Sequence, residues 1–90
     1  MDIPEYKLEL NAISERLKTL RKEKGYSNYE HIAFELGMSR SAYWRIESGN
    51  NFEIRTLLKI CTLLGITLEE FFEGIKLPTQ QNKNKGKSKR

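Results

Sequence analysis

Apolar residues recur along this chain at spacings of three and four, the repeat of one face of an α-helix. These stripes predict helices over residues 12–24, 28–36, 40–48, 54–64 and 68–73. The connections between them are short, and no alternating pattern of comparable strength predicts a sheet. The sequence therefore predicts an all-α fold, a compact bundle of five helices.

Polar residues at the predicted helix starts support these boundaries. Ser27 and Glu30 have the spacing of a capping box, in which each side chain bonds to the backbone N–H of the other residue. Thr67 and Glu70 repeat that spacing before the last helix. The apolar positions expected in the core include Tyr43, Ile46, Leu57, Leu58, Leu64 and Phe71.

A tight turn is predicted between the second and third helices. Gly37 suits the left-handed backbone just past a helix end, and Ser39 can cap the next helix. In that helix Tyr43 and Ile46 share one face. The opposite side carries Arg40, Ser41, Trp44, Arg45 and Ser48. A short helix with one anchored face and one face of arginines and hydroxyls is typical of a helix that enters the DNA major groove. We call residues 40–48 the reading helix.

The two ends of the chain differ from the predicted domain, which covers residues 12–75. Residues 1–11 are interpreted as an N-terminal arm, because Pro4 could begin a helix while Tyr6, Leu8 and Leu10 alternate as a strand would. Residues 76–90 contain Gln, Asn, Lys, Ser and Gly and almost no apolar side chain, so a disordered basic tail is expected there.

The positive charge of the chain is unevenly distributed. Sixteen Lys and Arg residues against twelve Asp and Glu give a net charge of +4. Six of the basic residues and none of the acidic ones lie in residues 76–90, so residues 1–75 carry ten against twelve, a net −2. The tail either attracts phosphate without sequence preference or serves only solubility. Within the domain one basic face is expected, from Arg16, Lys18, Arg21, Lys22 and Lys24 together with the reading helix.

Several classes of protein are disfavoured by composition. No apolar run has the length of a membrane span, and the start lacks the pattern of a secretory signal. The single cysteine, Cys61, is expected to be a buried apolar residue, which fits a cytoplasmic protein. His31 is expected at the surface without a metal role. Because no catalytic constellation, phosphate loop or ligand pocket is recognisable, we expect no enzyme activity, cofactor, metal or small-molecule ligand.

Two segments resemble the Cro/repressor-type, or XRE-type, helix-turn-helix family. Residues 33–49 keep Ala33, Gly37, Glu47 and Gly49 at the family spacing, and residues 57–72 match the last two helices. The likeness covers about residues 12–74 and implies a lambda-repressor-like fold. Members include phage repressors, controller proteins of restriction–modification systems and some antitoxins. The chain departs from the family by one extra residue before the second helix and a shorter connection after Gly49.

The resemblance implies a role in DNA binding for a set of surface residues. In the departing region Asn28 or Tyr29 replaces the glutamine that the family uses at a phosphate. Trp44 either lies against a thymine methyl or sugar or packs on a neighbouring helix. Ser39 and Asn51 could each be helix caps instead. The implied base contacts are Arg40, Ser41, Trp44 and Arg45, and the implied phosphate contacts are Asn28, Tyr29, Ser39, Ser48, Asn51 and Arg55.

The resemblance also implies a structural clamp and a function. Arg21 of the first helix would pair with Glu47 and hold the reading helix in place; the alternative is two separate solvated charges. Phe72, Ile75 and Leu77 are candidates for a dimer interface. The expected function is a homodimeric transcriptional repressor on a palindromic duplex operator. The alternative is an antitoxin or anti-repressor, whose main partner is a toxin or another protein.

Overall fold

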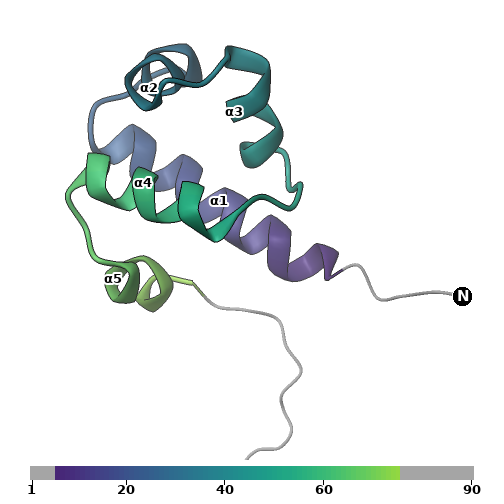
Figure 1. Cartoon of the computed structure of the whole chain (residues 1–90). Coiled ribbons are helices and arrows are strands. Elements are labelled where there is room, and N and C mark those ends of the chain that lie inside the picture. The colour runs from purple at the N-terminus through teal and green to yellow at the C-terminus, as the bar shows by residue number, and fades with distance from the viewer. Residues whose placement is uncertain (1–5, 76–90) are drawn as a thin grey trace, which may run out of the picture.

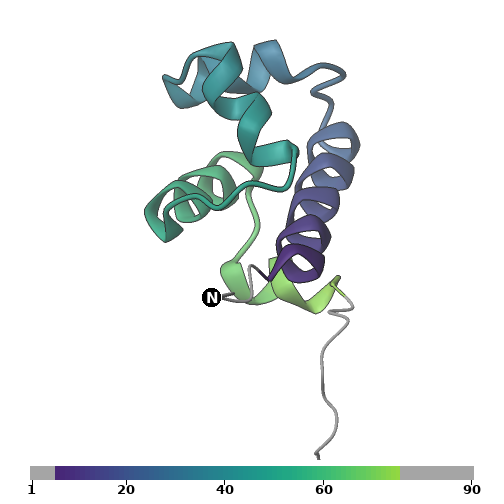
Figure 2. The ribbon, with the colours of Figure 1, turned by 90° about the vertical axis from the view of Figure 1, so that its right-hand side faces the viewer.

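The computed structural model describes residues 6–75, and within this range it contains helices and no strand. The helices are α1 (Lys7–Glu23), α2 (Tyr29–Leu36), α3 (Arg40–Glu47), α4 (Ile54–Leu64) and α5 (Leu68–Glu73). The predicted all-α fold of five helices is confirmed. Figure 1 shows α2 and α3 together at one end and α5 at the other, with α1 and α4 between them. The view turned by 90° gives the same order (Figure 2).

Every helix contributes at least one fully enclosed side chain to a single core. Leu17, Ile32, Tyr43, Ile60 and Phe71, one from each helix, are all 0% exposed. Burying a large apolar side chain stabilises the fold by about 1.5–3 kcal/mol. The expectation for Cys61 is confirmed, since its side chain is buried in this core. Burial also raises the pKa of its thiol.

Two predicted helix caps are present and one is displaced. The Ser39 hydroxyl accepts the Ala42 N–H at 3.1 Å, and the Thr67–Glu70 capping box is complete. The predicted box at Ser27 is wrong, because the N-cap of α2 is Asn28. The Asn28 side-chain oxygen accepts the His31 N–H at 3.1 Å. Asn28 satisfies the first turn in the same way that Ser27 would have done one residue earlier.

The first helix begins earlier than expected. Residues 7–11, assigned to an arm, form the first turns of α1. Residues 6–75 contain no strand with which the alternating apolar residues Tyr6, Leu8 and Leu10 could pair, and Tyr6 and Leu8 remain 63% and 64% exposed. Residues 7–11 therefore follow the helical repeat of α1 and not the alternation typical of a strand. The rest of the expected arm, residues 1–5, and the expected tail, residues 76–90, lie outside the described residues.

The buried face of α4 is rotated relative to its predicted stripe. Leu58, expected in the core, is 45% exposed, and Ile54 at the start of the stripe is 63% exposed. Ile60 is fully buried instead, together with Leu57, Cys61 and Leu64. Asn51 does not cap this helix, because the N-cap is Glu53, without a side-chain bond.

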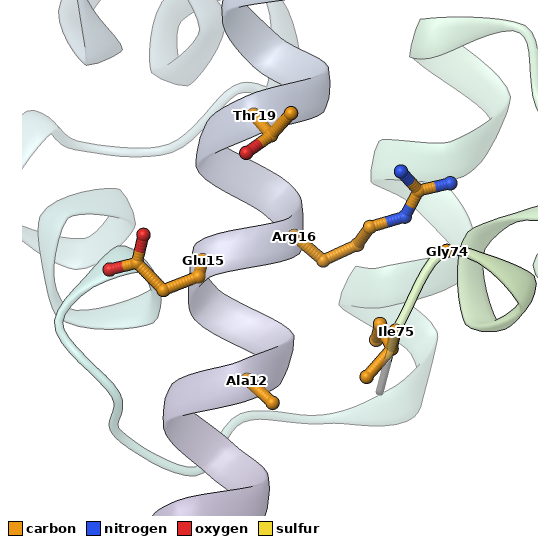
Figure 3. Close-up of a pocket in the computed structure, with 6 residues that line it drawn as sticks. All are labelled: Ala12, Glu15, Arg16, Thr19, Gly74 and Ile75. Carbon is orange, nitrogen blue, oxygen red and sulfur yellow. The ribbon is translucent and has the colours of Figure 1, made fainter. Parts of the chain in front are cut away.

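Arg16 joins α1 to the end of α5. Its Nε donates to the Phe71 carbonyl at 2.8 Å, and its Nη2 donates to the Glu70 carbonyl at 2.9 Å. The guanidinium also lies 5.9 Å from the centre of the Phe71 ring. Figure 3 shows Arg16 reaching from α1 toward Gly74 across a hollow of about 280 Å³. Arg16 thus satisfies two carbonyls near the end of α5. Its side chain is used in this contact and is not part of the expected basic face.

Candidate nucleic-acid interface

The turn between α2 and α3 fixes the angle between these two helices. Gly37 has a φ of +73°, and its N–H bonds to the Phe34 carbonyl. The next N–H, of Met38, bonds to the Ala33 carbonyl at 2.9 Å. These two bonds end α2 and place Ser39, the cap of α3, directly after the turn. A side chain at Gly37 would strain the left-handed backbone that this geometry needs.

The inner face of α3 is attached to α1. Tyr43 is fully buried and Ile46 is 4% exposed. The Ser14 hydroxyl of α1 donates to the Ile46 carbonyl at 2.6 Å. The position of α3 is therefore set by both apolar packing and a buried hydrogen bond.

Arg21 and Glu47 form a buried ion pair beside this contact. Arg21 Nε and Nη2 donate to the two carboxylate oxygens of Glu47 at 2.7 and 3.2 Å, and both side chains are 5% exposed. Arg21 Nη1 donates to the Tyr26 carbonyl at 2.7 Å, and the Tyr43 hydroxyl donates to Glu47 at 2.7 Å. The pair is the clamp between α1 and the reading helix, and two separate solvated charges are excluded.

Burial raises the pKa of Tyr43 far above its ordinary value of 10.0, with further contributions from the hydrogen bond to Glu47 and its negative charge. Because the folded state holds this proton more tightly than the unfolded chain, stability is unaffected below pH 10. Above it, stability should fall by about 1.4 kcal/mol per pH unit. Urea unfolding at pH 9, 10 and 11 measures this slope.

Tyr43→Phe is the control for this pH dependence. The other tyrosines are the same in both proteins, so the difference in slope isolates the buried hydroxyl. The variant should lose stability at neutral pH, since Glu47 loses a donor, but its stability should fall less steeply above pH 10. Parallel slopes in the two proteins would contradict the assignment.

The outer face of α3 is open over the part of the chain that the structure describes. Arg40, Ser41, Arg45 and Ser48 are exposed. Trp44 is 50% exposed, so it does not pack away under a neighbouring helix. Two hollows flank Trp44. One, of about 200 Å³, is lined by Tyr29, Arg40, Ser41 and Trp44; the other, of about 270 Å³, is lined by Lys18, Arg21, Tyr29, Trp44, Glu47 and Ser48.

A helix fixed on its inner side and open on its outer side, directly after a tight turn, is the arrangement of a DNA-reading motif. A family model described as helix-turn-helix matches residues 17–71. The chain belongs to the helix-turn-helix family. Within it the Cro/repressor, or XRE, type expected from the sequence is confirmed.

A curated relative points the same way. This helix-turn-helix chain is 43% identical over 61 residues to "Control protein C.MunI" of Mycoplasma sp., and the match covers 67% of this chain and 82% of the relative. No solved structure matches the chain at a significant level. The protein is thus a helix-turn-helix DNA-binding regulator.

The residues expected to contact phosphate differ in their exposure and in whether their polar groups are already bonded within the chain. Tyr29 is half-buried and lines both hollows beside Trp44. Asn28, Asn51 and Arg55 are exposed, and the Asn28 side-chain oxygen is occupied as a cap. The Ser48 hydroxyl donates to the Trp44 carbonyl at 2.8 Å, so its proton is shared with the backbone of α3. Tyr29 is thus the α2 residue of this set that lies beside the reading helix.

Sequence reasoning missed one residue of this surface, Glu30 of α2, whereas Lys18 was expected on the basic face. Lys18 lines the hollow between α1 and Trp44, and the basic run at the end of α1 was the signal for it. Glu30 of α2 accepts a bond from Arg40 Nη1 at 2.7 Å. No feature of the sequence pairs Glu30 with Arg40, because the contact depends on the angle between α2 and α3.

Between residues 6 and 75 there is no cluster of His, Cys, Asp and Glu side chains suited to a metal ion. None of the helices there has the length and apolar character that a membrane crossing requires. His31 lies at the surface, 3.5 Å from Glu35 and edge-on to the Tyr26 ring.

Proposed function

We propose that this regulator represses transcription as a homodimer bound to a roughly palindromic operator in duplex DNA. The observation that carries the proposal is the open outer face of α3, with two arginines and a half-exposed tryptophan on a helix whose inner face is fixed. A fixed helix loses little conformational freedom on entering a groove, so more of its contact energy appears as affinity. The similarity to a protein named a control protein supports a regulatory role.

Contacts on this surface divide into two kinds. Arg40, Ser41, Trp44 and Arg45 would meet base edges and set the sequence. Tyr29 and the exposed phosphate candidates, Asn28, Ser39, Ser48, Asn51 and Arg55, would meet the backbone and fix the register of the protein on the duplex. Lys18, beside the second hollow, adds a cation to this backbone set.

A dimer surface is proposed at α5. Phe71 fills the core, while the adjacent Phe72 is 37% exposed and packs edge-on against the Phe71 ring at 5.1 Å. Ile75 is half-buried next to it, and Leu77 lies outside the described residues. Two neighbouring phenylalanines on one short helix cannot both enter a small core, so the second is available to a partner copy.

Selection of binding sequences from random duplexes by the full-length chain tests this function. The expected product is a pair of inverted half-sites whose centres lie about 34 Å apart, one turn of DNA. Phe72→Ser should weaken self-association in sedimentation and weaken binding to the paired site more than to a single half-site. Leu58→Ser is the matched control, because it removes a partly exposed apolar residue from α4 (45% exposed, against 37% for Phe72), and it should retain both properties.

Two results would contradict the proposal. Enrichment of one unpaired half-site, with a monomer at all concentrations, would overturn the homodimer. Equal losses for Phe72→Ser and Leu58→Ser would overturn the interface at α5.

A protein partner is the alternative function. The specific observation in its favour is Phe34, which is 80% exposed on the outer side of α2. An antitoxin or anti-repressor could use such a residue to bind a toxin or another protein. If the chain co-purifies with a stoichiometric protein partner and shows no salt-dependent affinity for any duplex, this alternative replaces the repressor.

A further inference from the structure

Arg40 is held by an ion pair across the surface that would face DNA. Its Nη1 donates to Glu30 Oε2 at 2.7 Å, which links the first turn of α3 to the first turn of α2. The two side chains are 64% and 59% exposed. Exposed ion pairs contribute little to stability, because water screens the charges and both side chains lose freedom. The orientation of the guanidinium is thus the main consequence of this contact.

The Arg21 guanidinium offers a comparison for Arg40, because both groups have Nη1 bonded to an oxygen. Arg21 Nη1 is held by the Tyr26 carbonyl, and its Nε and Nη2 together bind the two oxygens of Glu47. Arg40 is held at the same nitrogen, by Glu30. Within residues 6–75 the structure records no hydrogen bond from Arg40 Nε or Nη2. That free edge carries two parallel donors, the pattern that matches guanine O6 and N7.

We propose that Glu30 is a positioning residue that directs the free edge of Arg40 to a guanine and thereby sets specificity. This inference rests on the proposed function. Glu30 acts in two ways. It orders the arginine before binding, so that less side-chain freedom is lost in the complex. Its negative charge also opposes the phosphates, which lowers the sequence-independent part of the affinity for every duplex.

Glu30→Gln tests the proposal in the full-length chain. The probes are a duplex selected by the wild-type protein from a random library, its single-base variants, and an unrelated duplex of equal length. Arg40→Ala first identifies the base pair that Arg40 reads, as the position at which the preference is lost. At that position Glu30→Gln should weaken the guanine preference by about two- to tenfold, the cost of ordering one long side chain.

The same variant should bind the unrelated duplex more tightly at low salt. The slope of log affinity against log salt concentration should be steeper by up to about one. Glu35→Gln is the matched control, because it removes the same charge from α2 but its partner is His31 on the same helix. It should leave the preference at the Arg40 position unchanged. Melting temperatures of both variants should match the wild type, since both pairs are exposed.

The outcomes separate this inference from the function on which it rests. If Glu30→Gln keeps the full guanine preference, or if Glu35→Gln reduces it equally, Glu30 does not position Arg40 and only this inference is overturned. A preference reduced at every position equally would also overturn it, because that result reports a general change in the domain. If the wild-type chain selects no duplex at all, the proposed function and this inference both fail.

Discussion

Replacing Arg21 by Met is expected to lower the free energy of unfolding by about 3–5 kcal/mol. The substitution leaves the buried Glu47 carboxylate, 5% exposed, with the Tyr43 hydroxyl as its one remaining donor among residues 6–75. It also removes the donor to the Tyr26 carbonyl. A buried charge without its counter-charge is far less stable than the intact pair, because the interior cannot replace the water that it has lost. The loss should be visible in urea unfolding at neutral pH.

The double variant Arg21→Met with Glu47→Leu is the decisive companion to this experiment. It removes both charges and keeps an apolar volume, so a large part of the lost stability should return. Arg45→Met is the surface control, because Arg45 is exposed on the outer face of α3, and its effect should stay within about 0.5 kcal/mol. If Arg21→Met costs no more than Arg45→Met, the pair does not hold α3 to the domain.

The parts of the fold that were predictable from sequence are those with local causes. The turn at Gly37, the cap at Ser39 and the capping box at Thr67 depend on residues within a few positions, and each is present. The burial of Leu58 was predicted wrongly for the opposite reason. Neighbouring apolar stripes on α4 differ by one residue, and packing against the other helices decides which of them is buried.

The same distinction between local and long-range causes applies to the candidate site. The outer face of α3 follows from helical periodicity, because Tyr43 and Ile46 fix which side is inside. The Arg21–Glu47 pair spans 26 residues, and only the family resemblance indicated it. The roles of Arg16, at the end of α5, and of Glu30, beside Arg40, depend on how helices pack against one another. Local sequence carries no signal for such contacts.

Trp44→Ala is expected to weaken binding to the selected operator by about 1–3 kcal/mol, the second large effect. The ring is half-exposed between the hollow beside Arg40 and the hollow beside Lys18, with Tyr29 lining both. An apolar ring in that place can meet a thymine methyl or a sugar, and water is released from both surfaces when it does. The loss should be larger for the operator than for an unrelated duplex if the ring meets a base.

Replacing single thymines of the operator by deoxyuridine separates the two contacts. Deoxyuridine lacks only the methyl group, so pairing and the phosphate backbone are kept. If Trp44 meets a thymine methyl, one such replacement should weaken wild-type binding and leave Trp44→Ala binding unchanged, as in a double-mutant cycle. If every replacement weakens both proteins equally, the ring meets no methyl group. Equal losses of Trp44→Ala on the operator and on the unrelated duplex would then place the tryptophan against the sugar-phosphate backbone.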